Sequence, residues 1–588
     1  MPTILGIGGL LGHDGNAALI VDGKLIAASQ EERFSRRKHD GAFPRLAIDD
    51  CLRAAAKSAE DIDWCVLDAK PIQSLIYDRL ERPSNALSRL IAGLAPRSIS
   101  PYEADARRLF PQARIGYAWH HLTHAAGAFY TSPFDRAAFL CIDGKGEDIN
   151  ATIGVIDNRA SAPLYELPYA NGLGLLYTLV TYYLGFWSFG SEYKVMGLAP
   201  YGRPAFVAKL KEFVESDTYG ALRLKTRASF RHEDMKTTVE LLARHLGIPA
   251  RGKADPLAEA HVDIAASIQE LFEEETLKMA RFAREVTGEA NLLFCGGCAQ
   301  NCVTAGKLRN AGIFDAVFNS PVGGDMGTGL GAAALTMQHL GHEPTKLDVR
   351  GYYLGPEPGL APDEASRFEV PSTGSVHRAA AQLLSEGYVV GWVRGRMELG
   401  ARALGARSIL ADPRVPRMQS VLNLKVKFRE SFRPFAPAIL GEDCADWFDT
   451  DQPSDFMQYT AYLLPRHRRQ PPTDLRGLRE RLDFERSEIS SVIHVDYSAR
   501  IQTVRKEVHP DFHQLISEFK QVTGVPIIIN TSFNVSGQPI VCTATEAWEC
   551  FRHTDMDFLV INDRVYRNPN DKTREEKLAW LKRFEKSA

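Results

Sequence analysis

Two histidines and an aspartate have the spacing of a metal site. His120 and His124 are four residues apart, so in an α-helix they lie one turn apart on the same face. Two imidazoles on one face can bind a single metal ion. Asp143 follows 19 residues after His124, where the apolar run 140–142 meets the glycine-rich stretch 144–147. A metal site beside such a turn suggests nucleotide-linked transfer chemistry, although a histidine pair can also serve only hydrogen bonding in a core.

The chain is long enough for at least two domains. Its 588 residues exceed what one hydrophobic core usually supports. Hydrophobic residues make up 45% and charged residues 24%, as in ordinary globular proteins. The net charge of −3 gives no argument for binding nucleic acid or a membrane, and no apolar run is long enough to span a bilayer. The N-terminus does not have the pattern of a signal peptide and the nine cysteines are an odd number, so we expect a reducing, cytoplasmic location.

The first half of the chain contains a unit of strands and a helix twice. In each copy, an apolar strand is followed by a glycine turn, two further strands and a helix. The expected strands are 3–8, 17–21, 24–29 and 63–67 with a helix over 46–55, then 137–143, 151–156 and 164–167 with a helix over 172–184. This duplicated α/β unit resembles the ribonuclease-H-like core of the actin and sugar-kinase superfamily, in which nucleotide binds between the two halves.

Glycine-rich turns recur where nucleotide would lie in such a fold. The strand 292–295 leads into two glycines, and the stretch 323–329 opens another helix. Backbone N–H groups at helix starts attract phosphate, and glycine lets a ligand approach the backbone closely. We therefore expect nucleotide contacts in this half at Gly144, Gly146, Gly296, Gly297, Asn301 and Gly324. The alternative is that these glycines only permit tight packing; a metal role for the Cys295 and Cys298 pair is weak because a zinc site needs a second pair.

A second region begins beyond residues 345–355, where proline and glycine are frequent. Strands are expected over 387–393, 491–504 and 527–529, a polar turn over 530–534 and a solvated basic loop over 466–486. Arginines and lysines recur between 394 and 433, separated by glycine, serine and phenylalanine. Such a cluster can form a nucleic-acid face or a pocket for a multiply charged small anion. The nearly neutral chain and the irregular aromatic spacing favour the anion pocket.

Together these motifs resemble the NodU/CmcH family of O-carbamoyltransferases, which includes enzymes that tailor antibiotics. The matching segments of the first half are 12–14, 31–36, 120–125, 143–147 and 192–202. Those of the second half are 402–405, 407–410, 429–437 and 531–534. They span nearly the whole chain in the family's order, so jointly they are far more specific than any one of them.

The resemblance implies two domains and two reactions. Residues 1–350 would form an actin-like domain, similar to the universal tRNA threonylcarbamoyltransferase, and residues 351–588 a YrdC-like α/β domain. The YrdC-like domain would combine ATP and carbamoyl phosphate into carbamoyladenylate. The actin-like domain would then move the carbamoyl group to a hydroxyl of a small acceptor, such as a natural product or a sugar. Mg²⁺ would accompany ATP, and neither nucleic acid nor membrane is an expected partner.

Matching the motifs residue by residue implies roles within this chain. Ligands of carbamoyl phosphate and the adenylate are implied at Arg402, Lys427, Arg433, Arg500 and Ser532, with Asn530 and Asn534 beside them. The implied ligands of a divalent metal are His120, His124, Asp143 and Asp325. The family metal is Fe²⁺-like, and two imidazoles with two carboxylates also suit Mn²⁺ or Zn²⁺. His13, on the first glycine turn, is implied as the general base that takes the acceptor's proton.

Four residues depart from the family's pattern. Ala401 replaces the usual proline before Arg402, and Tyr497 replaces a glycine near Arg500. Cys298 and Gln300 alter the run after the Gly-Gly turn, where Gln300 replaces an apolar residue. None of these changes removes an implied metal ligand or the base, and we expect them to affect nucleotide or acceptor handling.

Other functions match part of the pattern. One is carbamoyl transfer to an amine or a thiol; the hydrogenase-maturation relative that modifies cysteine also carries an acylphosphatase domain and CxxC zinc fingers, which are missing here. Another is tRNA modification of the threonylcarbamoyl type, which the nearly neutral charge disfavours. A third is a non-enzymatic, nucleotide-gated binding protein, which the cation cluster disfavours.

Overall fold

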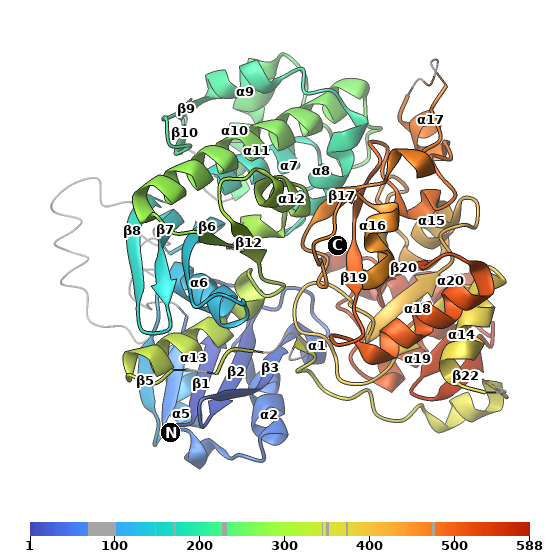
Figure 1. The fold of residues 1–588 in the computed structure, drawn as a ribbon, viewed down its shortest axis with the longest axis horizontal. Helices are drawn as coiled ribbons and strands as arrows, with labels where there is room; N and C mark the ends of the chain where they lie inside the picture. The colour runs from blue at the N-terminus through green and yellow to red at the C-terminus, as the bar shows by residue number, and fades with distance from the viewer. Residues whose placement is uncertain are drawn as a thin grey trace.

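The computed structural model describes residues 1–68, 101–147, 149–168, 172–225, 232–343, 345–347, 352–371, 374–472, 475 and 477–587. An N-terminal half built on two five-stranded sheets lies beside a C-terminal half built on an eight-stranded sheet (Figure 1). These mixed sheets, covered by helices, confirm the expected α/β class. The expected domain border at 350–351 lies outside the described residues.

The first sheet has the strand order β3-β2-β1-β4-β5. Its strands are β1 (Ile4–Gly8), β2 (Asn16–Val21), β3 (Lys24–Gln30), β4 (Trp64–Leu67) and β5 (Arg114–Tyr117). The first three strands pair antiparallel, whereas β4 pairs parallel with both β1 and β5. Asp22 and Gly23 close the β2–β3 hairpin with φ of 50° and 80°, as a type I′ turn requires. Helix α2 (Arg45–Ala54) packs on β2 and β3.

The second sheet repeats this topology. Its strands are β6 (Arg136–Gly146), β7 (Ile149–Asp157), β8 (Ser161–Pro168), β11 (Asn291–Cys295) and β12 (Ala316–Asn319). Strands β6, β7 and β8 pair antiparallel, and β11 pairs parallel with β6 and β12. The order β8-β7-β6-β11-β12 therefore matches the first sheet strand for strand. The turn expected at 144–146 is instead an irregularity inside β6, where the register with β7 shifts between Ile142 and Gly146.

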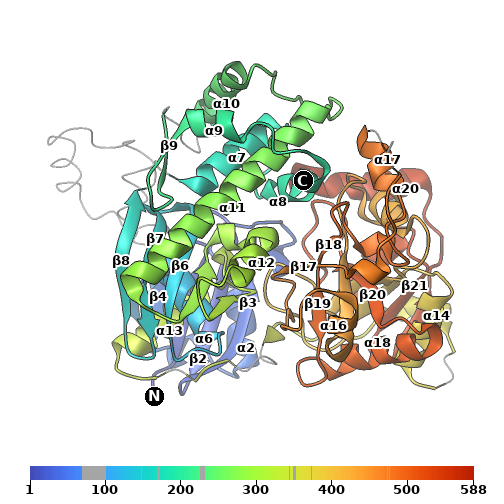
Figure 2. The same ribbon diagram turned by 45° about the horizontal axis from the view of Figure 1, so that its top comes forward.

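Two helices connect the sheets. Helix α6 (His120–Tyr130) packs on the second sheet, α13 (Thr328–His339) packs on the first, and the two helices pack on each other (Figure 2). Gly331 permits this contact, because a Cβ there would lie 1.8 Å from the carbonyl oxygen of Thr123 on α6. The N-terminal turns of both helices are thereby brought together.

A layer of helices covers the outer side of the second sheet. Helices α7 (Leu173–Tyr183) and α11 (Glu259–Thr287) both pack on β6, and α10 (His232–Leu246) packs on α7. Further elements of this half are α1 (Glu32–Ser35), α5 (Pro101–Leu109), α8 (Glu192–Leu198), α9 (Val207–Phe213), β9 (Val214–Ser216), β10 (Leu222–Leu224) and α12 (Cys302–Asn310).

The large sheet of the C-terminal half has the order β13-β22-β21-β14-β15-β20-β16-β19. Its strands are β13 (Glu369–Val370), β14 (Val390–Val393), β15 (Arg407–Ala411), β16 (Ala436–Leu440), β19 (Gln502–Val504), β20 (Ile527–Ser532), β21 (Phe558–Ile561) and β22 (Arg564–Arg567). Helices α14 (Val376–Ser385) and α18 (Pro510–Thr523) share a core with one face of the sheet, and α19 (Ala544–Arg552) with the other. Ile528 faces the first core, whereas Ile527 and Ile529 face the second. This strand is apolar throughout because both of its faces are buried.

Two expectations for the C-terminal half are wrong. Residues 491–504 form two short strands in different sheets, β18 (Ser498–Arg500) beside β17 (Thr460–Tyr462) and β19 in the large sheet. The segment 466–486 contains helix α17 (Gly477–Asp483), where Arg481 donates to Glu259 of α11 at 2.8 Å. Local patterns could not show either feature, because both depend on contacts with distant parts of the chain. Short helices α15 (Met418–Val421) and α16 (Cys444–Trp447) and helix α20 (Arg574–Leu581) complete the elements used here.

Two further properties concern membrane-spanning helices and the cysteines. Among the described helices, none has the length and apolar character needed to cross a membrane. All nine cysteines are free thiols.

Candidate functional site

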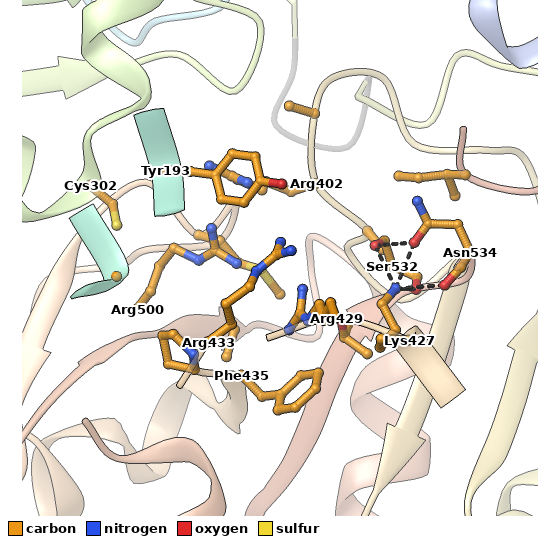
Figure 3. A pocket seen from close by; sticks show the side chains of 18 of the residues that line it. Tyr193, Cys302, Arg402, Lys427, Arg429, Arg433, Phe435, Arg500, Ser532 and Asn534 are labelled. Atoms are coloured by element: carbon orange, nitrogen blue, oxygen red, sulfur yellow. Dashed lines mark hydrogen bonds between the residues drawn. The ribbon is translucent and has the colours of Figure 1, made fainter. Parts of the chain in front are cut away.

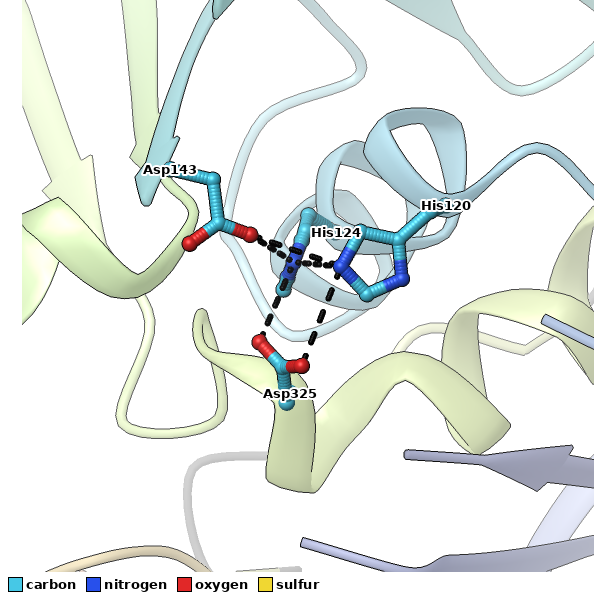
Figure 4. A group of neighbouring side chains, drawn as sticks. All are labelled: His120, His124, Asp143 and Asp325. Carbon is cyan, nitrogen blue, oxygen red and sulfur yellow. Dashed lines mark hydrogen bonds and ion pairs between the residues drawn. The ribbon is translucent and has the colours of Figure 1, made fainter. Parts of the chain in front are cut away.

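Four buried side chains converge in the N-terminal half (Figure 4). The ligand atoms of His120, His124, Asp143 and Asp325 all lie within 4.8 Å of one another. The two imidazole Nε2 atoms are 3.1 Å apart, and Asp143 Oδ2 lies 3.4 Å from the first and 3.3 Å from the second. Asp325 Oδ1 lies 3.6 Å from His124 Nε2. The structure therefore brings together all four residues that the sequence suggested as metal ligands.

Three chain segments supply these ligands. Both histidines lie in the first turns of α6, Asp143 lies in β6, and Asp325 begins the 3₁₀ turn Asp325–Gly327 that leads into α13. Asp143 Oδ1 accepts the N–H groups of Gly144 and Gly297 at 2.8 and 3.2 Å, so Oδ2 is left for the imidazoles. Although burial favours the neutral acid, hydrogen bonds with His120 and His124 hold the pKa of Asp143 well below its usual range. Asp143 is thus ionised and suited to bind a cation.

This cluster fits a divalent metal. Each imidazole turns its Nε2 atom toward the shared centre, and the Nδ1 atoms of His120 and His124 are buried with no hydrogen-bond partner among the described residues. Asp68 is fully buried directly after β4 and lies 3.7 Å from His120 Nδ1, where it can orient the ring. Two imidazoles and two carboxylates form a donor set that suits Fe²⁺, Mn²⁺ or Zn²⁺. The cluster could therefore hold one such ion.

The glycine-rich turns surround this cluster. Gly146 lies against His121, where a Cβ would approach Nε2 to 2.4 Å. Gly296 has φ of 87°, and a Cβ there would lie 2.3 Å from the carbonyl oxygen of Ile142. Gly324 directly precedes Asp325 in the chain. Asn301 instead caps α12, because it accepts the N–H of Thr304 at 3.1 Å and donates to Gln269 at 2.9 Å.

His13 lies beside the metal cluster, in the loop after β1. Its Nδ1 atom is 3.1 Å from Asp14 Oδ2 and 3.5 Å from Asp325 Oδ2. The other oxygen of Asp14 is 2.9 Å from Nδ1 of His39, so one carboxylate joins two imidazoles. Burial alone would lower the pKa of His13, but Asp325 and Asp14 raise it to about 9. The half-exposed ring of Phe189 packs on His13 with 4.4 Å between the ring centroids.

A pocket with a volume of about 270 Å³ lies between the two halves (Figure 3). It extends from the polar turn after β20 to Asp14 and His39 of the N-terminal half. All of the expected anion ligands line it, namely Arg402, Lys427, Arg433, Arg500, Asn530, Ser532 and Asn534. Residues that are distant in the sequence therefore share one cavity, and that cavity reaches the neighbour of His13.

The end of β20 and the turn after it hold Lys427. The strand continues through Ser532, so the polar turn expected over 530–534 begins only at residue 533. The Lys427 ammonium donates to the carbonyl oxygens of Ser532 and Asn534, both at 2.7 Å, and to Asn534 Oδ1 at 2.6 Å. Burial lowers the pKa of Lys427 well below its usual range, and the neighbouring Arg429 lowers it further. Asn530 donates to Gln502 Oε1 at 2.7 Å, while its own Oδ1 is buried without a partner among the described residues. The end of β20 and the turn after it therefore present both the Lys427 ammonium and, at Asn530, an acceptor oxygen with no partner among the described residues.

Five arginines line the pocket, Arg33, Arg402, Arg429, Arg433 and Arg500, and Figure 3 labels the last four. Arg433 stacks on Tyr193 and Arg429 on Phe435, at 4.5 and 4.7 Å from the ring centroids. The side chains of Arg402 and Arg500 have no hydrogen bond or ion pair with any described residue. Burial and the adjacent Arg500 lower the pKa of Arg402 to about 9. The pocket thus concentrates positive charge that needs an anionic ligand.

Three residues of these sites were missed as individual candidates in the sequence. Arg429 and Tyr193 lie inside segments that matched the family, 429–437 and 192–202, so their motif positions could have identified them. Asp68 follows an apolar strand directly, and such an acid at a strand end is the signal that could have found it.

Two of the four departures from the family's pattern lie in the C-terminal half. Ala401 lines the pocket beside Arg402. Tyr497 has φ of 67°, a left-handed conformation that glycine adopts without strain. In compensation, its hydroxyl donates to the carbonyl of Arg469 at 2.5 Å, and the guanidinium of Arg468 stacks on its ring at 5.0 Å. The tyrosine therefore ties the segment 466–486 to the turn that precedes β18.

Two solved structures match part of this chain at low sequence identity. HypF of T. kodakarensis has a TM-score of 0.31 and 14% identity over 59% of this chain and 49% of its own. The activator of the 2-hydroxyisocaproyl-CoA dehydratase from Clostridium difficile, with bound ADPNP, has a TM-score of 0.30 and 13% identity over 57% of this chain and 95% of its own.

Sequence relatives establish the family. An uncharacterized protein of Synechocystis sp. is 39% identical over the full length of both chains. Nodulation protein NolNO of Sinorhizobium fredii is 36% identical over 94% of this chain and 79% of its own, and nodulation protein U of Rhizobium tropici is 28% identical over 92% of each. The family model of the carbamoyltransferase N-terminus matches residues 3–334, and that of the carbamoyltransferase C-terminus matches residues 381–568. The chain therefore belongs to the carbamoyltransferase family and is a transferase, as its motifs predicted.

Proposed function

We propose that this enzyme is an ATP-dependent O-carbamoyltransferase with one site that activates the carbamoyl group and another that transfers it. The observation that carries the proposal is the pocket between the halves, where the cationic side chains that line it outnumber the acidic ones. Such a pocket calls for a ligand with several negative charges. ATP and carbamoyl phosphate have those charges, and membership in the carbamoyltransferase family favours them over other polyanions.

The activating reaction forms carbamoyladenylate in this pocket. Carbamoyl phosphate and water give carbamate and phosphate, and a carbamate oxygen then attacks the α-phosphorus of ATP and expels pyrophosphate. The proposed phosphate ligands are Arg402, Lys427, Arg433 and Arg500, with Ser532 and Asn534 as neutral partners. The buried Oδ1 of Asn530, which has no partner among the described residues, is an acceptor suited to the carbamoyl NH₂ group. Mg²⁺ would accompany ATP.

Transfer is proposed at the metal cluster. A divalent ion held by His120, His124, Asp143 and Asp325, Fe²⁺ by family resemblance, would supply positive charge that polarises the carbamoyl carbonyl. Asp14 holds the His13 ring through Nδ1, which leaves Nε2 to take the proton from the acceptor hydroxyl as its oxygen attacks the carbamoyl carbon and AMP leaves. Asp325 contributes to the raised pKa of His13, and a cation bound by Asp325 would offset that contribution.

We also propose that the AMP part of the intermediate lies against the glycine-rich turns during transfer. The residues concerned are Gly144, Gly146, Gly296, Gly297, Asn301 and Gly324. The N–H groups of Gly144 and Gly297 already donate to Asp143. We therefore propose that these glycines let the AMP part approach the backbone closely, because they have no side chain.

The domain assignment follows the two sites. We propose an actin-like domain of duplicated ribonuclease-H-like type over 1–350, which the repeated five-stranded topology supports. The proposed YrdC-like domain over 351–588 contains the eight-stranded sheet and most of the cationic pocket. A cytoplasmic location is supported by nine cysteines that are all free thiols.

The first test measures pyrophosphate release without any acceptor. We expect release from ATP that depends on carbamoyl phosphate, because all of the proposed phosphate ligands line one pocket of this chain. Release that is the same with and without carbamoyl phosphate would contradict the activating reaction.

The second test identifies the acceptor. The enzyme is incubated with ATP, isotope-labelled carbamoyl phosphate and an extract of its source organism. We expect label in a carbamate ester on a small hydroxyl compound, such as a sugar or natural product. Label on an amine, a thiol or tRNA would overturn the assignment of a hydroxyl acceptor.

A further inference from the structure

The short helix α1 of the N-terminal half contacts the loops that form the anion pocket of the C-terminal half. It lies where the two halves meet (Figure 1). Its residue Arg33 and the residue that ends it, Arg36, both donate to backbone carbonyl groups of the C-terminal half. The contact therefore depends on guanidinium groups from one half and on the loop conformation of the other.

Arg33 contacts the loop that carries Arg402. Its Nη2 atom donates to the carbonyl oxygen of Gly400 at 2.8 Å and to Gln30 Oε1 at 3.1 Å, while Nη1 lies 2.9 Å from Glu32 Oε1. The side chain is buried. Gly400 has φ of 108°, a conformation open to glycine, and is two residues before Arg402. The buried guanidinium of Arg33 thus holds the loop at Gly400, where the backbone would otherwise be conformationally free.

Arg36 contacts the other end of the pocket. Its Nη1 and Nη2 atoms donate to the carbonyl oxygens of Ile540 at 2.8 Å and Pro539 at 2.9 Å. These residues follow the turn that holds Lys427, and within that turn Asn534 Nδ2 donates to the carbonyl oxygen of Gln538 at 2.6 Å. Arg36 therefore supports the far side of the turn on which the Lys427 ammonium depends.

Helix α1 is also connected to His13, the proposed general base, through His39 and Asp14. Glu32 Oε2 accepts the backbone N–H of His39 at 2.9 Å, and His39 shares Asp14 with His13. Helix α1 is thus connected to both proposed sites through hydrogen bonds and ion pairs.

We propose that Arg33 and Arg36 are positioning residues for carbamoyladenylate formation. By holding the backbone beside Arg402 and beyond the Lys427-binding turn, they let the N-terminal half complete the activating site of the C-terminal half. This inference rests on the proposed function. Removing either guanidinium leaves buried carbonyl groups without a donor, and loop shifts of about 1 Å at such a site cost about 10²-fold in rate.

The experiment uses full-length R33M and R36M, which keep an unbranched apolar side chain but lose the donors. Carbamoyl-phosphate-dependent pyrophosphate release is measured at saturating ATP without acceptor. We expect kcat/KM for carbamoyl phosphate to fall about 10²-fold in each variant. R33K and R36K keep the charge with a single donor atom, and we expect partial recovery.

R481M is the matched control. Arg481 also joins the halves, through Glu259 of α11 and the carbonyl of Tyr201, but it does not line the pocket. We expect its kcat/KM to stay within about twofold of the original enzyme. Thermal unfolding of every variant shows whether the fold is retained.

The outcomes separate this inference from the proposed function. If the original enzyme releases pyrophosphate and folded R33M and R36M do so with unchanged kcat/KM, the inference is overturned while the proposed function stands. Equal losses in R33M, R36M and R481M would also overturn it, because loss of any contact between the halves would then suffice. If the methionine variants do not fold, the lysine variants decide: reduced rates support positioning, and unchanged rates overturn it. An original enzyme without carbamoyl-phosphate-dependent release refutes the proposed function itself.

Discussion

His120 Nε2 and His124 Nε2 lie 3.1 Å apart in a buried cluster with two carboxylates. At this distance the two neutral imidazoles can share one hydrogen bond, and two Nε2 protons would clash. A divalent cation that binds both lone pairs removes this conflict and balances Asp143 and Asp325. The four residues could therefore hold one divalent cation.

Replacing His120 by alanine should remove the bound metal. We expect the metal content of the purified full-length protein, measured by elemental mass spectrometry, to fall at least about tenfold, since even loss of a supporting partner of a ligand costs about 10- to 100-fold in affinity. The control is His121→Asn, because His121 bonds to Thr152 Oγ1 at 2.8 Å and is not part of the cluster. Full metal content together with full transfer in His120→Ala would show that the metal assignment is wrong.

Lys427→Met should abolish activation while leaving the pocket's arginines in place. The change removes a buried cation and leaves the carbonyl groups of Ser532 and Asn534 without their donor. We expect pyrophosphate release to fall by about 10²-fold or more. Lys425→Met is the matched control, because Lys425 is exposed and lies two residues away. A normal rate in Lys427→Met would mean that the activating site lies elsewhere.

His13→Asn should separate the two reactions. Asparagine cannot take the acceptor's proton, so transfer of labelled carbamoyl groups should fall by about 10²- to 10⁴-fold. Carbamoyl-phosphate-dependent pyrophosphate release should be unchanged, because His13 does not line the anion pocket. Loss of both activities, or of neither, would argue against His13 as the base.

His509 should make stability depend on pH. Burial lowers the pKa of His509 from 6.5 to about 4 in the folded chain. The unfolded chain therefore binds more protons between these values, so the stability conferred by neutral His509 is complete above pH 6.5 and is lost as pH falls toward 4. The loss amounts to about 3 kcal/mol.

His509→Asn tests this dependence directly. His509 Nδ1 accepts the N–H of Phe512 at the start of α18, and asparagine can cap the helix in the same way without titrating. We expect the difference in denaturation midpoint between the two proteins to shift in favour of the variant as pH decreases from 6.5 to 4. A difference that is constant over this range would show that His509 does not titrate as described.

Local sequence predicted most of the elements that carry the N-terminal site. The strands around the Asp22–Gly23 turn were found because apolar periodicity and turn chemistry are local properties. For His120 and His124 the sequence indicated only a spacing that suits a helix, without bounds for α6. Even Ile527–Ile529 could be recognised as a buried strand from its continuous apolar run. The residues 491–504 were not predicted correctly, because the chain changes sheets after Arg500 and no local signal marks the change.

The sequence by itself determined the family, the ligand types of the metal cluster and the cations of the anion pocket, since these depend on side-chain chemistry in ordered motifs. Only the tertiary structure decided that Arg402, Lys427 and Arg500 share one cavity, and that helix α1 of the other half supports it. The physical reason is that Arg33 and Arg36 bind the carbonyl groups of Gly400, Pro539 and Ile540. Every residue has a carbonyl group, so only the folded backbone determines which ones meet an arginine.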